Sequence, residues 1–307
     1  MLARIGYYIF VLPLSYLPLG ILYVFTDFLY LILVTTGVYR KSTIEENIER
    51  SFPNLSLSER KKIKRKFYRH FTDLLAEGIK NLSISEKQLK KRFNVVNPEL
   101  MQELHNRKRN VLLVSGHYNN WEWLITAQNF LFPHKAIGIG MPLSSKFWDK
   151  KINSRRERYG MKVVNAKNYK LELKANPEVL KAVLVLSDQS PGDALKSYWM
   201  DFLNQQTPVL FGAEIMAHDL DYSVVFFATR KIKRGYYKME LSLVAEKPSN
   251  TSWGQITESH TNKLEKEIID QPAYWLWSHK RWKRQQPENL AVLKKKQNEN
   301  FNKRFNL

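Results

Sequence analysis

Cysteine is absent from the 307 residues of this chain. Without a thiol, the chain has no disulfide, no thiolate nucleophile and no metal site built from cysteine ligands. The chain also lacks an HExxH segment and a tight cluster of histidine and acidic residues, so we expect neither a metal nor another cofactor. No Gly/Ser-rich linker, low-complexity block or fixed-period repeat divides it. Its length is sufficient for one large catalytic domain with a sizeable core.

Acidic side chains are scarce relative to basic ones. Lys and Arg number 49 and Asp and Glu 29, which gives a net charge of +20. Nucleic acid, anionic lipid headgroups and an acidic carrier protein all fit this charge. The basic residues are spread along the chain without an RRM, KH or zinc signature, so we expect no specific nucleic-acid partner. Eight tryptophans and an aromatic content of 13% suit a membrane interface, where a ring is half wet.

The N-terminal segment is almost free of charge. Between residues 5 and 38 the only charged side chain is Asp27. A single helix of this length would reach ~50 Å, against a hydrocarbon core of ~30 Å, so one simple perpendicular span is excluded. Pro13, Pro18 and Gly20 lie near the middle and are able to break a helix. One tilted helix, a spanning helix with an interfacial one, and a shallow hairpin all remain open.

A cleaved signal peptide and a buried core helix are the competing interpretations of this segment. The apolar run is longer than a signal-peptide core of ~7–15 residues, and no small-residue cleavage site follows it. Basic residues follow instead, at Arg40 and Lys41, in KKIKRKFYRH at 61–70 and in KKRF at 90–93. We therefore predict a membrane anchor over residues 1–40. The basic body is expected on the cytoplasmic side, drawn to an anionic membrane surface.

Strand-like and helix-like segments alternate after the anchor. Short β-branched apolar runs predict buried strands over 111–116, 136–140, 221–230 and 236–244. Residues 179–189 are predicted to hold a helix end followed by another buried strand. Apolar residues at helical spacing predict a helix over 58–80, and an N-cap with acidic residues in the first turn predicts one over 42–50. Further helices are predicted over 120–130, 146–159 (before Gly160), 212–220 and 253–272 (closed by proline). This alternation predicts an α/β domain over 41–287, with a mixed, largely parallel central sheet flanked by helices.

The sharpest local signal is SGHYNNWEW at 115–123, directly after the strand predicted at 111–116. Chemistry in α/β proteins is concentrated past the carboxyl ends of such strands. On one ideal helix His117 and Glu122 would diverge by ~140°. They meet only if His117 lies in the turn and Glu122 in the first turn of the helix. We predict this arrangement, and the two residues as the catalytic pair.

The chemistry of acyl transfer accounts for such a pair. A neutral imidazole can take the proton of an alcohol as the alcohol attacks an acyl carbonyl. A carboxylate on the other ring nitrogen fixes the tautomer and stabilises the imidazolium. Backbone N–H groups or an arginine would stabilise the oxyanion, and no covalent acyl-enzyme is required. The alternative is that His117 is a satisfied core histidine and Glu122 a surface acid.

Three ordered segments carry a family resemblance. HYNNWEW resembles the H-x-x-x-x-(D/E) segment of glycerolipid acyltransferases, in the form typical of the late acyltransferases of lipid A biosynthesis, the lauroyl and myristoyl transferase family. SDQSPGDALKSYWMDFLNQQTPVLFGAEIMA at 187–217 is similar to that family's Asp-(Gln/His) stretch, and QPAYWLWSHKRWKRQQP at 271–287 to its C-terminal Trp/His/Arg stretch. With the N-terminal anchor, the resemblance covers nearly the whole chain.

The resemblance implies roles for particular residues. His117 and Glu122 would be the catalytic dyad. Asp188 and Gln189 match the acidic stretch and would bind or orient substrate. An arginine of SRRERYG at 154–160 also matches, and the spacing leaves Arg156 and Arg158 open, with Arg156 favoured.

The resemblance also implies substrates and a location. The donor would be acyl carrier protein or another thioester, and an acidic carrier would dock on a basic surface. The acceptor would be a hydroxyl of a lipid A-type glycolipid precursor, on the cytoplasmic side of the bacterial inner membrane. A different polar lipid as acceptor, and a non-catalytic basic protein that binds membrane or nucleic acid, are the alternatives.

Two C-terminal regions carry weaker expectations. Trp275, Trp277 and Trp282 alternate with basic residues at 280–284, which fits an interfacial or phosphate-binding surface, or core packing with a solvated basic rim. We favour the surface. Residues 288–307 form a polar, lysine-rich tail that matches no motif.

Overall fold

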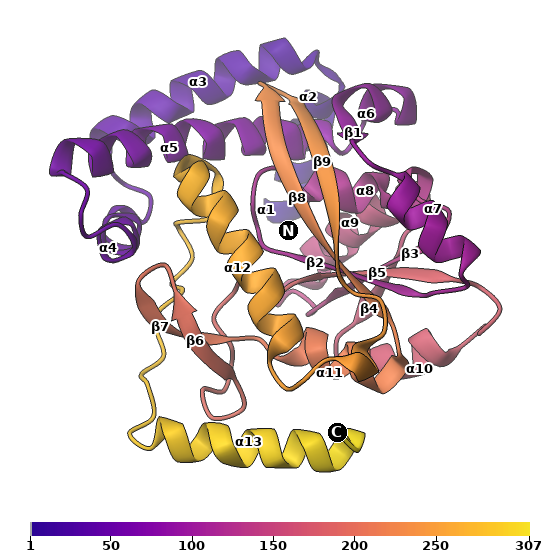
Figure 1. Cartoon of the computed structure of the whole chain (residues 1–307). Coiled ribbons are helices and arrows are strands. Elements are labelled where there is room, and N and C mark those ends of the chain that lie inside the picture. Colours follow the sequence, from indigo (N-terminus) through magenta and orange to yellow (C-terminus); the bar gives the residue numbers. More distant parts are fainter. Residues whose placement is uncertain (1) are drawn as a thin grey trace.

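A seven-stranded sheet forms the centre of the computed structural model, which describes residues 2–307 (Figure 1). The strand order is β1-β9-β8-β2-β5-β3-β4, and the bounds are β1 (Phe93–Val95), β2 (Val111–Ser115), β3 (Lys135–Gly140), β4 (Lys162–Asn165), β5 (Lys181–Leu186), β8 (Ser223–Lys233) and β9 (Tyr236–Ala245). From β8 to β4 all neighbouring pairs are parallel, whereas β9 runs antiparallel to β8 and parallel to β1. The predicted mixed, largely parallel sheet is confirmed.

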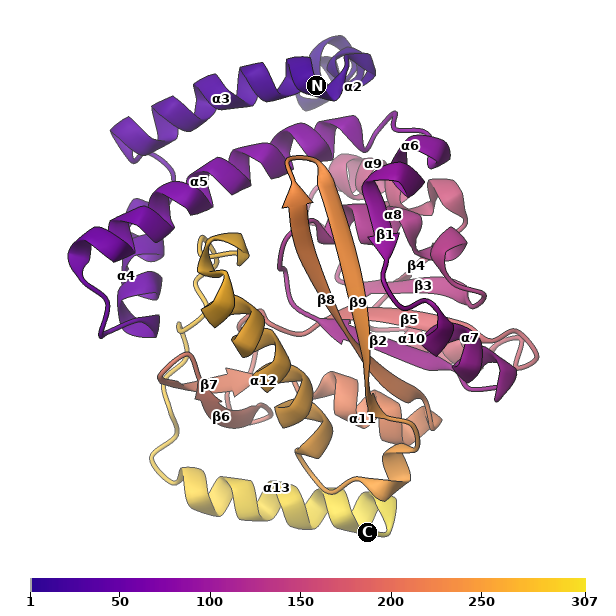
Figure 2. The same ribbon diagram turned by 45° about the horizontal axis from the view of Figure 1, so that its top comes forward.

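Helices cover both faces of this sheet (Figures 1 and 2). One face carries α6 (Glu86–Arg92), α7 (Glu99–Asn106) and α8 (Trp121–Leu131), and the other α10 (Tyr169–Lys174), α11 (Gly212–Leu220) and α12 (Gln255–Asp270). Because successive side chains of a strand point to opposite faces, β2 contributes to two cores. Leu113 packs in one core with Trp123 of α8, and Val114 in the other with Leu264 of α12.

Most of the predicted elements are present, and the differences are informative. The helix predicted over 146–159 is α9 (Lys146–Arg156) followed by a 3-10 turn, η2 (Glu157–Tyr159). The helix end expected before β5 is wrong, because the preceding helix, α10, already ends at Lys174. The antiparallel hairpin of β6 (Tyr198–Phe202) and β7 (Gln205–Val209) was not predicted. Its strands carry few β-branched residues, and its turn is the Leu203–Asn204 pair with positive φ.

The apolar N-terminal segment is broken into two helical parts. The first comprises α1 (Leu2–Gly6), π-helical η1 (Tyr7–Val11) and α2 (Leu12–Tyr16), and the second is α3 (Leu19–Thr36). The break falls at Leu17 and Pro18, which are extended, while Pro13 lies in the first turn of α2 and Gly20 inside α3. One continuous tilted helix is thereby excluded. Among the residues described, α3 is the one helix long and apolar enough to cross a membrane by length and composition.

Helix α3 packs against a long helix of the body, α5 (Leu57–Lys80), which α4 (Lys41–Ser51) precedes (Figures 1 and 2). Helix α5 begins at a capping box, in which the Ser56 hydroxyl accepts the Glu59 N–H and the Glu59 carboxylate accepts the Ser56 N–H. The apolar N-terminal segment is therefore packed on the body and not separate from it.

The lysine-rich tail is also helical. It forms α13 (Leu290–Phe305), which lies along the edge of the molecule opposite α3 in Figure 1. Phe301 is buried against Phe211 and the ring of His218. Arg304 pairs with Asp219 of α11 at 2.6 Å. These contacts fix the tail on the domain even though its sequence matches no motif.

Candidate active site

The site forms where two neighbouring parallel strands end. β2 and β5 pair in register up to Ser115 and Leu186. The carboxyl ends of adjacent parallel strands meet at the same sheet edge, so the loops that follow them converge there. His117 lies two residues past the end of β2, and Asp188 two residues past the end of β5. The topology thus brings together two residues that are 71 positions apart.

His117 and Asp188 contact each other twice. The imidazole Nδ1 lies 2.6 Å from Asp188 Oδ1, and the His117 backbone N–H donates to Asp188 Oδ2 at 2.8 Å. Because a carboxylate is an acceptor, this contact assigns the ring proton to Nδ1 and leaves Nε2 with a lone pair. The His117 side chain is 16% exposed, whereas that of Asp188 is 3% exposed. The imidazole is therefore reachable while its carboxylate partner is enclosed.

Asp188 is held as an anion. Burial acts to raise the pKa of this carboxyl, but the charge and hydrogen bonds of His117, with the indole N–H of Trp275 donating at 2.8 Å, outweigh burial and lower the pKa to about 2. A buried carboxylate with several donors is the expected environment for such a shift. Asp188 is thus ionised at any physiological pH and able to stabilise an imidazolium on His117.

Gly116 lets the two loops approach this closely. A Cβ at this position would lie 2.5 Å from Leu264 Cδ2 and 2.8 Å from Asp188 Oδ2. No real side chain tolerates these separations without a shift of its neighbours. The glycine that precedes His117 is therefore required by the contact between the turn and Asp188.

We expect Gly116→Ala to displace Asp188 from the imidazole and to lower the free energy of unfolding by about 1–3 kcal/mol, as overpacking does in a dense core. Gly140→Ala is the matched control, because a Cβ there meets nothing within 4 Å. Urea titration gives the stabilities, and a transfer assay gives the activity. Equal activity of the two variants would contradict the required close approach.

Glu122 occupies the first turn of α8, as predicted, but the expected hydrogen bond between it and His117 is wrong. The carboxylate on the imidazole is that of Asp188. Glu122 instead pairs with Arg156, whose Nη2 lies at 2.6 Å, and with Arg155. Burial acts to raise the pKa of Glu122, but Arg155 and Arg156, with a smaller effect of His117, lower it to about 2. Glu122 therefore lies near His117 and fixes two guanidinium groups beside it.

Of the other predicted site residues, Gln189 and Arg156 lie at the site and Arg158 does not. The Gln189 amide lies 3.4 Å from His117 Nε2. Gln189 is therefore at the edge of the imidazole that would receive the substrate proton. Arg156 is at the site through Glu122, joined by Arg155, which the sequence did not single out. Arg158 is not brought to the site, because its guanidinium donates to the carbonyl oxygens of Leu82 and Ile84.

The turn between His117 and α8 is held by two asparagines. Asn119 has a φ of +55°, a left-handed conformation that asparagine tolerates, and its amide donates to the Thr229 carbonyl at 2.6 Å. Asn120 is the N-cap of α8, and its side-chain oxygen accepts the Trp123 N–H at 2.9 Å. The two asparagines of the HYNN segment at 117–120 therefore fix the shape of the turn. Trp121 packs edge-on against the His117 ring, at 5.1 Å between centroids.

The favoured interpretation of the C-terminal tryptophans as a surface is wrong for Trp275 and Trp277. Both are buried, and Arg281 is 1% exposed. Trp275 donates to Asp188, and the His279 ring nitrogen Nε2 accepts the Ser190 N–H at 3.0 Å. This segment therefore supports the loop after β5 from behind, a role that only its spatial proximity to Asp188 reveals.

An apolar groove borders the catalytic turn. It encloses about 180 Å³ between α5, the turn and the C-terminal segment. Its lining residues are Phe71, Leu74, Leu75, Gly78, Asn119, Asn120, Trp121, Glu122 and Leu276. Most of the groove surface is apolar. Two of its lining residues, Trp121 and Glu122, also lie beside His117. Across residues 2–307, no group of three or more His, Asp or Glu side chains is placed to hold a metal ion.

A histidine oriented by a buried carboxylate, with two guanidinium groups and an apolar groove beside it, defines an α/β enzyme site suited to acyl transfer. The chain belongs to the bacterial lipid A biosynthesis acyltransferase family, whose family model matches residues 4–284. It is similar to the lipid A biosynthesis lauroyltransferase of Escherichia coli (strain K12), with 23% identity over 245 residues, which cover 80% of this chain and 79% of that protein. The protein is thus an acyltransferase of the lipid A biosynthesis type, as the sequence resemblance implies.

Proposed function

We propose that this protein moves a fatty acyl chain from a thioester on acyl carrier protein to a hydroxyl of a lipid A-type glycolipid precursor, with His117 as general base. The observation that carries the proposal is the contact of His117 Nδ1 with Asp188 at 2.6 Å. This contact leaves the lone pair on Nε2 to receive a proton, at a position that the Gln189 amide approaches to 3.4 Å. The family and the lauroyltransferase relative support the acyl group and the glycolipid class.

The proposed step balances without a covalent enzyme intermediate. His117 Nε2 takes the hydroxyl proton while the hydroxyl oxygen attacks the thioester carbonyl. The carbon–sulfur bond then breaks, and the imidazolium returns its proton to the leaving thiolate. Asp188 remains ionised throughout and stabilises the imidazolium, because the pKa of its carboxyl is lowered to about 2.

Glu122 acts in this proposal as a positioning residue. Its carboxylate holds Arg155 and Arg156 beside His117. A guanidinium has five N–H donors, so each arginine keeps donors free after binding Glu122. These donors would stabilise the oxyanion of the tetrahedral intermediate or bind a phosphate of a substrate.

The apolar groove would hold the acyl chain. Its residues on α5 are Phe71, Leu74, Leu75 and Gly78. Glycine inside a helix is unfavourable by about 1 kcal/mol relative to alanine, and at Gly78 no close contact requires it, since a Cβ would meet nothing within 4 Å. A requirement for open space in the groove explains this glycine.

We expect Gly78→Leu to shift the preferred acyl donor toward shorter chains, because the new side chain would fill the groove. Gly78→Ala is the control: it adds one methyl group, should raise the stability of α5 by up to about 1 kcal/mol, and should change chain preference little. Transfer rates with carrier protein charged with fatty acids of a series of lengths give the answer. A uniform loss at all lengths in the leucine variant would argue against the groove.

The function itself is tested by incubating the purified protein with acyl carrier protein charged with a labelled fatty acid and with a glycolipid precursor. Transfer of label to the glycolipid is the expected result. Lipid mass spectrometry of a strain that lacks the gene would identify the natural acceptor. If the wild-type protein shows neither transfer nor thioester hydrolysis above a His117→Ala background, the proposed function is wrong.

Membrane association and carrier docking complete the proposal. The helices α1–α3 expose apolar side chains, among them Phe10 and Phe28. The net charge of +20 favours both an anionic membrane surface and an acidic carrier protein. These features support placement at the bacterial inner membrane with the body on the cytoplasmic side.

A further inference from the structure

Helix α3 has two different long faces. Leu22, Tyr23 and Thr26 are buried against the body. The opposite side carries large apolar side chains that are all exposed: Ile21, Val24, Phe25, Phe28, Leu31 and Ile32. Steps of three and four residues place these six on one stripe of the helix. A contiguous exposed apolar stripe of this size marks a contact surface rather than ordinary solvent exposure.

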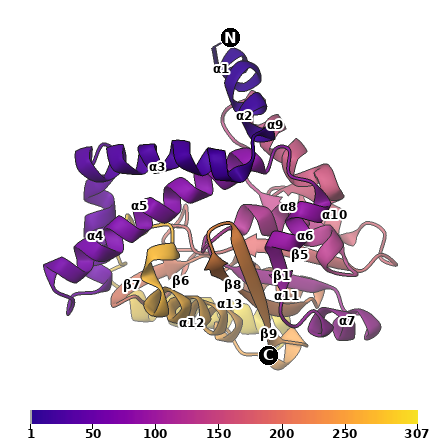
Figure 3. The same ribbon diagram turned by 90° about the horizontal axis from the view of Figure 1, so that it is seen from above.

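The stripe is continued by the preceding helices. Ile5, Tyr8, Ile9 and Phe10 are exposed on α1 and η1, and Figure 3 shows α1 projecting beyond the rest of the molecule. The exposed apolar surface thus extends over both N-terminal helical parts.

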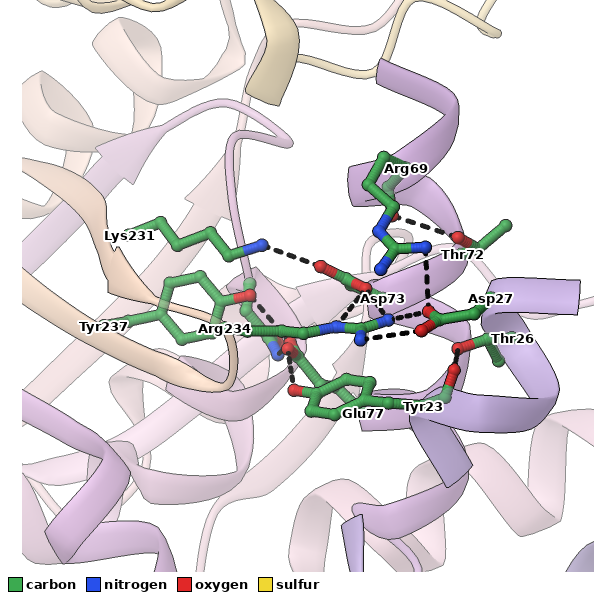
Figure 4. A network of polar contacts seen from close by, with 11 residues as sticks. Tyr23, Thr26, Asp27, Arg69, Thr72, Asp73, Glu77, Lys231, Arg234 and Tyr237 are labelled. Atoms are coloured by element: carbon green, nitrogen blue, oxygen red, sulfur yellow. Dashed lines mark hydrogen bonds and ion pairs between the residues drawn. The ribbon is translucent and has the colours of Figure 1, made fainter. Parts of the chain in front are cut away.

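The inner face of α3 is attached through charged groups (Figure 4). Asp27, near the middle of the helix, pairs with Arg69 of α5 at 2.9 Å and with Arg234 of the β8–β9 turn. Arg234 also contacts Asp73 at 2.7 Å, and Lys231 contacts the same carboxylate at 2.8 Å. Asp73 is only 2% exposed. We call these five residues the Asp27 latch.

A second set of bonds attaches the same helices on the N-terminal side of the latch. The Tyr23 hydroxyl donates to Glu77 at 2.7 Å, and the Tyr237 hydroxyl donates to the same carboxylate. The Lys80 ammonium donates at 3.0 Å to the carbonyl oxygens of Ser15 and Leu17. The end of α2 and the first half of α3 are therefore fixed on α5 by polar contacts.

These attachments are incompatible with a membrane crossing. A perpendicular α3 would place Asp27 with Arg69 and Arg234 at the centre of the hydrocarbon, where charged groups are strongly disfavoured. Detaching α3 to avoid this would separate Asp27 from Arg69 and Arg234 and would remove the Tyr23 hydroxyl from the buried carboxylate of Glu77, which is also unfavourable. We propose that α1–α3 lie in the plane of the membrane, inserted into one leaflet by their exposed apolar stripe, and that the Asp27 latch keeps α3 from crossing.

Charge identifies the partner as a lipid surface rather than a second copy of the chain. Lys62, Arg65 and Lys66 are exposed and precede Arg69 at helical spacing on α5. Arg4 and Lys150 are exposed near the other end of the apolar surface. An apolar face bordered by basic side chains is the pattern of an interfacial helix, which sinks about 5–10 Å into a leaflet with anionic headgroups. Two copies of such a face would oppose like charges.

The in-plane position has a consequence for the site. Glu77, which binds Tyr23 of α3, also accepts a hydrogen bond from the amide of Asn120. Asn120 caps α8 between His117 and Glu122. The latched helix thus sets the catalytic turn at a fixed position relative to the lipid surface. This inference rests on the membrane association included in the proposed function.

Single cysteines give a clean test because the natural chain has none. Variants Ile21→Cys, Phe28→Cys and Ile32→Cys are labelled with an environment-sensitive fluorophore and bound to vesicles of phosphatidylcholine and phosphatidylglycerol. Spin-labelled lipids that carry the quencher at a shallow or a deep position of the acyl chain report the depth. Ile269→Cys, another exposed apolar position, is the control.

We expect equal, shallow quenching at the three α3 positions and none at the control. Deep quenching at Phe28 with shallow quenching at Ile21 would show a crossing helix and overturn the proposal. Absence of quenching at all positions would refute membrane docking, and a dimer in solution with the labels already buried would show a second copy as the partner. Acyl transfer by the same variants in detergent tests the proposed function separately.

The latch itself is tested by adding Asp27→Asn to the Phe28→Cys variant. Loss of the pairs with Arg69 and Arg234 should allow the label to move deeper into the bilayer. Asp219→Asn is the matched control, because it removes ion pairs with Lys170 and Arg304 far from α3. An unchanged depth in the Asp27 variant would overturn the role of the latch.

Discussion

Replacing His117 by alanine should lower the rate of acyl transfer by about 10²–10⁴-fold, the range that a positioned general base contributes. The base would be Nε2, on which the Asp188 contact leaves a lone pair for the substrate proton. The side chain is at the surface of the site and 16% exposed, so the variant should remain folded.

The measurement is the turnover number with charged acyl carrier protein and a glycolipid acceptor, with circular dichroism as a check of the fold. His105→Ala is the control, since His105 lies on α7 and contacts His134 rather than the site. Near wild-type turnover in the His117 variant would contradict the proposal that His117 is the general base.

Replacing Asp188 by asparagine should lower the turnover number by roughly the same factor. The amide NH2 can donate to Nδ1 and so favour the wrong tautomer, and the neutral amide no longer stabilises the imidazolium. This effect is about 10⁴-fold where it has been isolated in a serine protease. The Michaelis constant should change little, since Asp188 is enclosed and touches His117 and Trp275 rather than substrate.

Glu122→Gln gives the contrast. It would release Arg155 and Arg156 while leaving the imidazole on its carboxylate. We expect this variant to change substrate binding as well as turnover. If Glu122→Gln reproduced the Asp188→Asn pattern, with turnover alone affected, Glu122 would be acting through the imidazole after all.

The pKa of Asp188 adds a test in the stability of the fold. The pKa of Asp188 is about 2 in the folded protein and 3.8 in the unfolded chain. Between about pH 2 and pH 4 the native state therefore binds fewer protons than the unfolded state. The ionised carboxylate therefore contributes to the free energy of unfolding above pH ~4, on the order of 2 kcal/mol, and this contribution is lost as the pH falls toward 2. The difference in stability between wild type and Asp188→Asn should narrow between pH 7 and pH 3. A constant difference would contradict the lowered pKa.

Local sequence determined the framework of the site. The apolar run at 111–115 predicted a buried strand from its own residues. Asn120 starts the next helix because its side chain caps the backbone. His117 between them was therefore placed at the strand end from the sequence. The same holds for the sheet class, since alternating apolar strands and helices have few stable arrangements.

The sequence did not predict which carboxylate contacts His117. Glu122 is five positions away and has the right chemistry, but its charge is matched by Arg155 and Arg156 from α9. Asp188 becomes the partner only because β5 lies next to β2 and the missing side chain of Gly116 lets its carboxylate approach. Strand order is a non-local property that pattern and spacing do not report.

The sequence by itself determined that the first forty residues are apolar, that the body is basic, and that a histidine follows a buried strand. Tertiary structure alone decided how these parts act together. Asp27, the lone charge in an apolar run, pairs with Arg234, which is 207 positions away in the sequence. This ion pair attaches α3 to the body. His117 finds Asp188 across two strands. Both outcomes depend on electrostatic partners that only the folded chain brings within contact, because ionic and hydrogen-bonding interactions act over a few ångströms of space and not along the sequence.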